Sequence, residues 1–294
     1  MRAQHAVSFT PTDATPTTGR GHARPNARSA EREHAVRGVT RGLTVRYGDR
    51  AARLPATPGG PAFGQAYLWR DDDGVTLVDT GIPGSEAAFA AAFDELGLRR
   101  ADLRRIVITH GHEDHTGSAA ALRAWGQGVG DGVTVYAHRA DAPIVRGLRR
   151  RAEPVLTPAE QPIFDSVSAG IPPVPPCQVD VELGDGDTID FGGGARVIAT
   201  PGHTDGSIAV ALPAHGVLFT GDLVANSDGG LLLGPFNTDR GLARVSFAAL
   251  SQVPAATVGF GHGDPLTGPE GAAAWRRLGE RCAAGPDAVP DPLG

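Results

Sequence analysis

The segment Thr109–Gly117 places three histidines and two carboxylates within six consecutive positions, from His110 to His115. The apolar run 106–108 before it predicts a buried strand, and the alanine-rich run 118–123 after it predicts a helix. Imidazoles and carboxylates crowded onto one strand-to-helix loop would repel one another or stay unpaired without a cation between them. A divalent metal ion is the simplest such cation, so we expect the chain to fold around a metal-binding loop.

The length and composition predict a soluble globular protein. The chain has 294 residues, enough for one large domain or two modest ones, and a hydrophobic content of 40% supports a sizeable core. A formal net charge of −6 argues against a nucleic-acid partner. No apolar run approaches a membrane span and no secretory leader is apparent, so we expect a cytoplasmic protein without membrane contact. The two cysteines, Cys177 and Cys282, indicate no disulfide framework.

Hydrophobic periodicity divides the chain into a tail and one domain. Residues 1–37 contain few large apolar side chains and predict a disordered tail, and the domain is expected over 38–294. Two strand-rich halves, each ending in helices, suggest packed sheets with helices outside. The predicted strands are 43–47, 66–70, 75–79, 106–108, 133–136, 179–181, 188–190, 195–199, 207–212, 216–220 and 257–260. The predicted helices are 84–96, 116–125, 242–250 and 269–281.

Residues 139–178 interrupt this pattern and predict an insertion over one face of the domain. Seven prolines between positions 154 and 176 exclude regular sheet. The insertion is interpreted as a lid, an ornamental loop or an oligomer contact. A predicted helix before the prolines carries Arg146, Arg149, Arg150 and Arg151. The simplest interpretation is a cationic helix face exposed to solvent. The alternative is that these arginines bind an anionic substrate.

Three later segments place a histidine or an aspartate directly after a predicted strand and beside glycine. They are Gly202-His203, Gly221-Asp222 and Gly261-His262. Loops at strand ends present functional groups on a rigid scaffold, and glycine lets the backbone approach closely. Together with the opening cluster, His-x-His-x-Asp-His, this ordered set resembles the metallo-β-lactamase fold superfamily. The similarity covers roughly residues 40–280 and implies an α+β fold, a four-layer αβ/βα sandwich of two mixed sheets with helices on the outer faces.

The resemblance implies a dinuclear metal site like that of glyoxalase II and lactonases. By position, one metal takes three histidines, the second takes one aspartate and two histidines, and a further aspartate bridges them. In that order the ligands are His110, His112 and His203; Asp114, His115 and His262; and Asp222. Nitrogen and oxygen donors suit two zinc ions per chain, with iron or manganese as alternatives. The family also implies that Asp79 braces the metal loop. Glu113, between ligands, is expected to be solvated.

These features favour a dinuclear hydrolase whose metal-bound hydroxide attacks an ester, thioester or lactone of a small metabolite. Asp114 is the expected catalytic residue, because it could also transfer a proton. Asp222 argues against a true zinc β-lactamase and His112 against a flavodiiron protein. The short chain after His262 argues against glyoxalase II itself, which uses a helical domain there to hold glutathione. The alternatives are a phosphodiesterase and a sulfur dioxygenase-type oxidoreductase with one iron on His110, His203 and Asp222. A homo-oligomer is also possible.

Overall fold

The computed structural model describes residues 37–40, 64–126, 132–169, 171–227 and 230–294. Its strands form two mixed sheets and a short ribbon. The first sheet contains, from edge to edge, β1 (Arg37–Thr40), β2 (Gln65–Asp71), β3 (Gly74–Val78), β4 (Leu103–Ile108), β5 (Thr134–His138) and β6 (Val181–Leu183). The second contains β13 (Thr257–Gly259), β10 (Val217–Phe219), β9 (Ile208–Leu212), β8 (Ala195–Ala199) and β7 (Thr188–Ile189). The ribbon pairs β11 (Val224–Ser227) with β12 (Gly230–Leu233).

The helices vary from single turns to a fifteen-residue helix at the end of the chain. The α-helices are α1 (Glu86–Glu95), α2 (Glu113–Thr116), α3 (Ala119–Arg123), α4 (Ala142–Val145), α5 (Gln161–Ser168), α6 (Arg240–Leu250) and α7 (Gly268–Cys282). The 3₁₀ turns are η1 (Arg100–Asp102), η2 (Ala124–Gly126), η3 (Pro213–His215), η4 (Gly221–Leu223) and η5 (Pro286–Ala288). Among the described residues, no helix combines the length and apolarity needed to cross a lipid bilayer.

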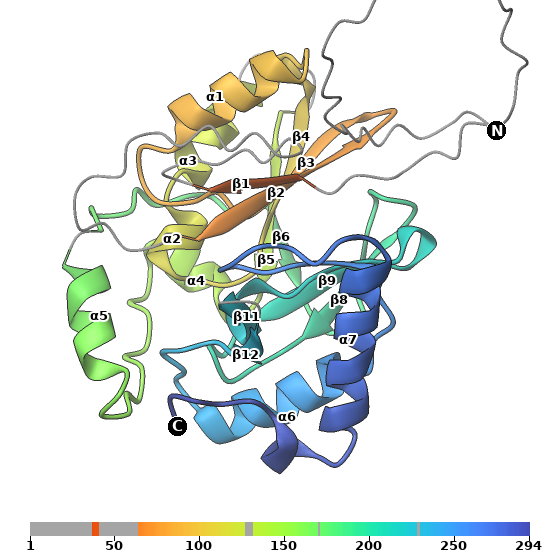
Figure 1. Ribbon diagram of the computed structural model, residues 1–294. Helices are drawn as coiled ribbons and strands as arrows, with labels where there is room; N and C mark the ends of the chain where they lie inside the picture. Colours follow the sequence, from red (N-terminus) through yellow and green to blue (C-terminus); the bar gives the residue numbers. More distant parts are fainter. Residues whose placement is uncertain (1–36, 41–63, 127–131, 170, 228–229) are drawn as a thin grey trace, which may run out of the picture.

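The core divides into three apolar clusters, which define four layers. In β4, Ile106 and Ile108 belong to the cluster under α1 and α3, whereas Val107 between them belongs to the cluster between the sheets. In β10, Leu218 packs in the cluster under α6 and α7, whereas Phe219 faces the first sheet. Both faces of each sheet are therefore apolar, because side chains alternate along a strand. Helices, sheet, sheet and helices follow one another (Figure 1), which confirms the predicted α+β αβ/βα sandwich.

Most predicted elements are present with shifted ends. The predicted hairpin is β2 paired antiparallel with β3. The predicted strand 43–47 and residues 1–36 of the predicted tail lie outside the described residues, and Arg37 begins β1. The ribbon of β11 and β12 was not predicted. Both cysteines are free and buried in different clusters.

Two helix predictions were wrong in their bounds. The helix expected over 116–125 is divided: the short helix α2 (Glu113–Thr116) lies within the metal loop, and α3 (Ala119–Arg123) follows it. The arginine-rich helix ends at Val145, because Gly147 adopts a left-handed backbone (φ 69°) that stops it. The four arginines therefore do not share a helix face. The described part of 139–178 contains no strand, as the prolines predicted, but it contains α5, which the sequence analysis missed.

Candidate metal centre

The topology of the second sheet brings three predicted sites to one edge. β10 runs parallel to β13, and β9 runs antiparallel to both β10 and β8. β8, β10 and β13 therefore point the same way, and the residues that follow their carboxyl ends are His203, Asp222 and His262. The loop after β4 of the first sheet meets this edge, where the amide of Ile208 donates a hydrogen bond of 2.9 Å to the carbonyl of Thr109.

Glycine beside these ligands is a steric requirement. A Cβ atom on Gly261 would lie 1.8 Å from Oδ1 of Asp222, and one on Gly221 would lie 3.0 Å from the Thr109 side chain. Gly221 also has a left-handed backbone, with φ of 53°. The glycines noted in the sequence motifs therefore let two strand-end loops approach each other closely.

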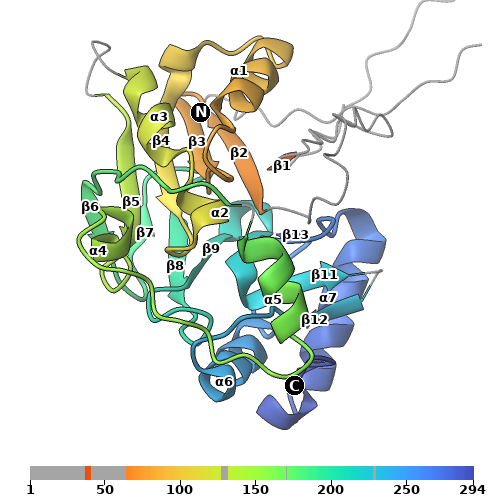
Figure 2. The ribbon, with the colours of Figure 1, turned by 90° about the vertical axis from the view of Figure 1, so that its left-hand side faces the viewer.

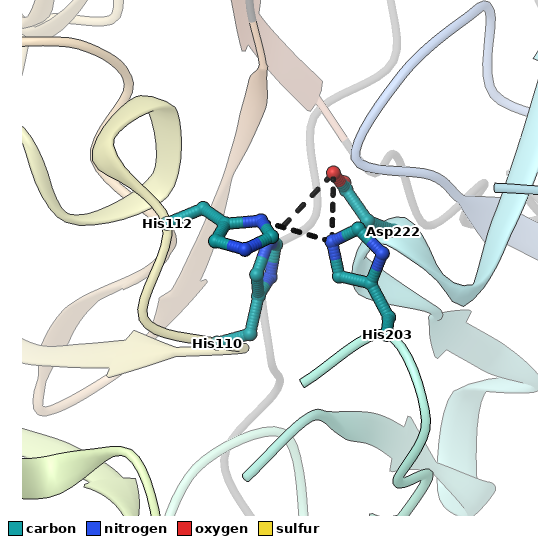
Figure 3. Close-up of side chains that lie close together, drawn as sticks. All are labelled: His110, His112, His203 and Asp222. Carbon is teal, nitrogen blue, oxygen red and sulfur yellow. Dashed lines mark hydrogen bonds and ion pairs between the residues drawn. The ribbon is translucent and has the colours of Figure 1, made fainter. Parts of the chain in front are cut away.

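The first group of donors consists of His110, His112, His203 and Asp222. Nδ1 of His112 lies 3.1 Å from Nε2 of His110 and 3.0 Å from Nε2 of His203. Oδ2 of Asp222 lies 3.7 Å from the His110 nitrogen and 3.6 Å from the His203 nitrogen. Figure 3 shows the three rings and the carboxylate directed at one another. Such separations fit donors that share one ion at about 2 Å.

The second group consists of Asp114, His115, His262 and, again, Asp222. Nε2 of His262 lies 3.3 Å from Oδ2 of Asp114 and 3.2 Å from Oδ2 of Asp222. Nε2 of His115 lies 3.1 Å from the other oxygen of Asp222, Oδ1. All seven predicted ligands are thus brought together, and Asp222 belongs to both groups.

Asp79 orients the buried His115 ring. Its Oδ2 lies 2.8 Å from Nδ1 of His115 and accepts the Thr109 hydroxyl at 2.7 Å, while its Oδ1 accepts the Thr109 amide at 2.8 Å. Asp79 itself has a left-handed backbone, with φ of 63°, and is buried. The carboxylate therefore turns Nε2 of His115 toward the donor group, which is the bracing role expected from the sequence.

Asp141 joins the two loops that supply the first group, and the sequence analysis missed it. Its Oδ2 accepts the Gly111 amide at 2.8 Å and the Thr204 hydroxyl at 2.7 Å, and its Oδ1 accepts the Gly206 amide at 3.0 Å. The side chain is buried, so these bonds hold the loop of His110 and His112 against the loop of His203. Asp141 follows β5, the same strand-end position that pointed to the other sites.

The two groups differ in the charge that their surroundings favour. Burial lowers the pKa of His110, His112 and His203, with neighbouring histidines adding to the effect. Burial also opposes charge on His115 and His262, but Asp222 and Asp114 outweigh it, raising the pKa of His115 and bringing the pKa of His262 to about 10. The first group thus presents neutral imidazoles, whereas the second holds protons that a metal ion would displace.

The residues present fit divalent cations. Nε2 of His115 and Oδ1 of Asp222 are buried and lie 3.1 Å apart, and neither makes a hydrogen bond among the described residues. Buried polar atoms without a partner are unfavourable, and a shared cation satisfies them. The donors are all nitrogen or oxygen, which suits zinc, iron or manganese.

A cavity of about 940 Å³ opens over both groups. The cavity floor consists of His112, Asp114, His203, Asp222 and His262. The cavity wall comes from described residues within 144–176 and 225–236 and from the C-terminal Pro292 and Leu293. The predicted insertion therefore lines the space above the ligands, where a substrate would lie.

The charged residues of the insertion make contacts within the chain. Arg146 pairs with Glu182, and Arg149 donates to the carbonyl of Ala140. Arg151 lies 3.0 Å from Glu113, whose side chain is 36% exposed, so Glu113 is partly solvated and also forms an ion pair. Among the described residues, the Arg150 side chain has no ion pair or hydrogen bond, and it lines the cavity.

Comparisons with known proteins agree with this geometry. The family model of the Metallo-beta-lactamase superfamily matches residues 59–262. An uncharacterized protein of Bacillus subtilis, YobT, is 32% identical over 53% of this chain and 60% of its own length. A hydroxyacylglutathione hydrolase of Rhodobacter capsulatus is 31% identical over 53% of this chain and 46% of its own length. The chain thus spans about half the length of these relatives.

Solved structures share the fold. A metallo-β-lactamase of Cronobacter sakazakii with a HARLDQ motif, in a mutant form, is 26% identical, with a TM-score of 0.52 over 69% of this chain and 73% of its own. The protein TTHA1623, solved in a di-iron-bound form, is 26% identical, with a TM-score of 0.52 over 74% of this chain and 94% of its own. The motif order, the four layers and the extent of the family match lead to one conclusion: the chain belongs to the metallo-β-lactamase superfamily.

Proposed function

We propose that the protein is a dinuclear metal-dependent hydrolase that cleaves an ester, thioester or lactone of a small molecule. The observation that carries the proposal is the sharing of Asp222 by two complete donor groups on the floor of one cavity. One cation is assigned to the first group and the second cation to the other. When bound, such a pair activates water and polarises the carbonyl under attack.

The residues of the chain orient these donors. Asp79 turns His115 toward Asp222, and Asp141 sets the spacing between the loops of His110 and His203. Asp114 lines the cavity, and its carboxylate is 3.3 Å from His262. We assign Asp114 the further role of accepting a proton during turnover, because its side chain is the ligand carboxylate more open to the cavity, with 16% exposed against 7% for Asp222.

The geometry favours this proposal over the mononuclear iron alternative. A site of His110, His203 and Asp222 alone would leave His112 outside. Yet Nδ1 of His112 lies 3.1 Å from Nε2 of His110 and 3.0 Å from Nε2 of His203, which are separations expected between ligands of one ion. The second group is also complete. The relative named a hydroxyacylglutathione hydrolase supports a hydrolytic reaction, and TTHA1623 keeps iron as a candidate metal.

The test combines metal analysis with a substrate panel. Protein purified without added metal is analysed for zinc, iron and manganese, and the same sample is assayed on thioesters, lactones, aryl esters, phosphodiesters and a chromogenic cephalosporin. Two metal ions per chain with cleavage of a carboxylic ester, thioester or lactone is the expected result. One iron per chain with oxygen consumption would overturn the proposal in favour of a dioxygenase. Cleavage of phosphodiesters alone would show that the enzyme is a phosphodiesterase and does not act on carboxylic esters.

A further inference from the structure

Helix α5 presents an apolar face to the cavity and a polar face to solvent. Ile163, Phe164 and Val167 all line the cavity, at spacings that share one side of a helix. On the outer side, the Gln161 amide donates a hydrogen bond of 2.9 Å to Asp165. No residue of α5 is buried, although the helix is amphipathic. Its apolar face therefore meets the cavity and not the core.

The residue that packs against α5, Phe236, is also apolar and has a strained backbone. The ring of Phe236 lies edge-on to that of Phe164, with centroids 5.3 Å apart. Phe236 has a left-handed backbone with φ of 63°, which is unfavourable for a bulky residue. Its amide donates a hydrogen bond of 2.9 Å to the buried carboxylate of Glu160, next to the start of α5. Strain of this kind persists where the surroundings hold it, and it is frequent at ligand sites.

The helix and the opposite wall are joined by polar contacts that lie outside the apolar surface. Glu160 is 2.5 Å from the guanidinium of Arg240, at the start of α6. The hydroxyl of Thr157 donates to the carbonyl of Leu293 at 2.5 Å, and the amide of Val155 donates to the carbonyl of Asn237 at 2.9 Å. α5 stands in front of the ribbon of β11 and β12 in Figure 2 and apart from it in Figure 1, and residues of both elements line the cavity.

We propose that the substrate carries a bulky apolar group, an aryl or a medium-length alkyl group, on one side of its scissile carbonyl. This group packs against the joined apolar surface of α5 and Phe236 while the carbonyl lies over the cavity floor. The inference rests on the proposed hydrolase function and names its substrate class. The arginines do not provide an equally strong anion site, because Arg146, Arg149 and Arg151 are engaged within the chain and Arg150 alone of the four lines the cavity without a partner among the described residues.

The first test varies the size of the apolar group in metal-loaded protein. One thioester series extends the acyl group from acetyl to octanoyl, and one ester series extends the alcohol from ethyl to octyl. In one of the two series, kcat/KM should rise roughly fourfold per added methylene until the cavity is filled. Flat or falling values in both series would overturn the inference while leaving the hydrolase proposal intact.

A matched pair of variants tests whether the preference for long substrates arises at α5. Ile163 is the third residue of α5, is 42% exposed and lines the cavity, whereas Leu242 is the third residue of α6, is 40% exposed and lies away from it. Ile163→Ser should lower the ratio of kcat/KM for the longest substrate to that for the shortest about tenfold. Leu242→Ser should leave that ratio unchanged. Equal effects of the two variants would contradict the inference.

A binding measurement separates the two proposals. Calorimetry on metal-loaded protein compares acetate with hexanoate and octanoate, and with the matching alcohols. Affinity that rises with chain length and falls in Ile163→Ser supports the apolar site even if no ester is cleaved, in which case the hydrolase proposal alone fails. Affinity that is independent of chain length for both acids and alcohols overturns the apolar site.

Discussion

The floor and the wall of the cavity are built in different ways. The floor residues follow the carboxyl ends of buried strands, and Asp79 and Asp141 hold their loops through hydrogen bonds of 2.7 to 3.0 Å. The wall contributed by the insertion rests on α5, which has no buried residue and is joined to the rest by a few polar contacts around Glu160. The comparison indicates that the sheets determine the chemistry, whereas an appended segment determines what reaches it.

The largest expected effect comes from the residue that the two donor groups share. Asp222→Asn should reduce the metal content below one ion per chain and lower kcat/KM on the order of 10⁴-fold, because two cations contribute several kcal/mol to the transition state. Elemental analysis and assay of the same sample measure both. Asp205→Asn is the control, since this exposed carboxylate is two residues from His203. Two tightly bound ions in Asp222→Asn would exclude the bridging role.

Asp114→Ala tests whether the second group is needed as well as the first. The variant should retain one metal ion per chain and a folded structure but lose on the order of 10³-fold in turnover, because it removes both a ligand and the proposed proton acceptor. Metal titration followed by circular dichroism and activity measures this. Full activity with the second position empty would contradict the two-metal proposal.

Asp141 tests whether loop spacing matters as much as ligand identity. Asp141→Asn keeps the size of the side chain but places an amide donor against the donors of Gly111, Thr204 or Gly206. We expect a loss of about 10- to 100-fold in affinity for the first metal, with the second less affected. Competition with a chelator measures each affinity. Thr204→Ser, which keeps the hydroxyl bond to Asp141, is the conservative control. Equal losses of affinity for the two metals in Asp141→Asn would indicate a general destabilisation.

The smallest effect on chemistry is expected from the contacts that hold the wall. Glu160→Ala leaves the amides of Phe236 and Thr157 without their acceptor and should lower the free energy of unfolding by about 1–3 kcal/mol. The metal content should not change, because Glu160 touches no ligand. Urea unfolding and elemental analysis measure these quantities. Glu153→Ala, on an 83% exposed side chain of the same segment, is the control. Loss of metal in Glu160→Ala would show that floor and wall are not separate.

The strand ends explain how the sequence indicated the residues that the structure brings together in the two donor groups. His110, Asp222 and His262 closely follow apolar runs and, like His203, stand beside glycine, so a short window of sequence carries both the strand and the donor. Asp141 also follows a strand, but it lacks a flanking glycine or a second donor, and its partners Thr204 and Gly206 are more than 60 positions away. Nothing in its local sequence reveals those contacts.

The insertion shows the opposite case. The spacing of Arg146, Arg149 and Arg150 predicted a cationic helix face, but Gly147 ends the helix and the guanidiniums of Arg146 and Arg149 bind groups of their own chain. The prolines correctly excluded sheet, yet they did not show that an amphipathic helix would follow them. Its polar anchor, Glu160, pairs with Arg240, and its Phe164 meets Phe236, both far along the chain.

The sequence by itself indicated most strands and helices and the family resemblance that implies the donor set, because hydrophobic periodicity and motifs at strand ends are local signals. The tertiary structure alone decided that the donors of distant loops converge in two groups, that Asp141 joins two loops and that α5 turns its apolar face to a cavity. The physical reason is that hydrogen bonds and packing between distant segments depend on how the sheets and the insertion meet in space, and no local pattern of residues specifies that.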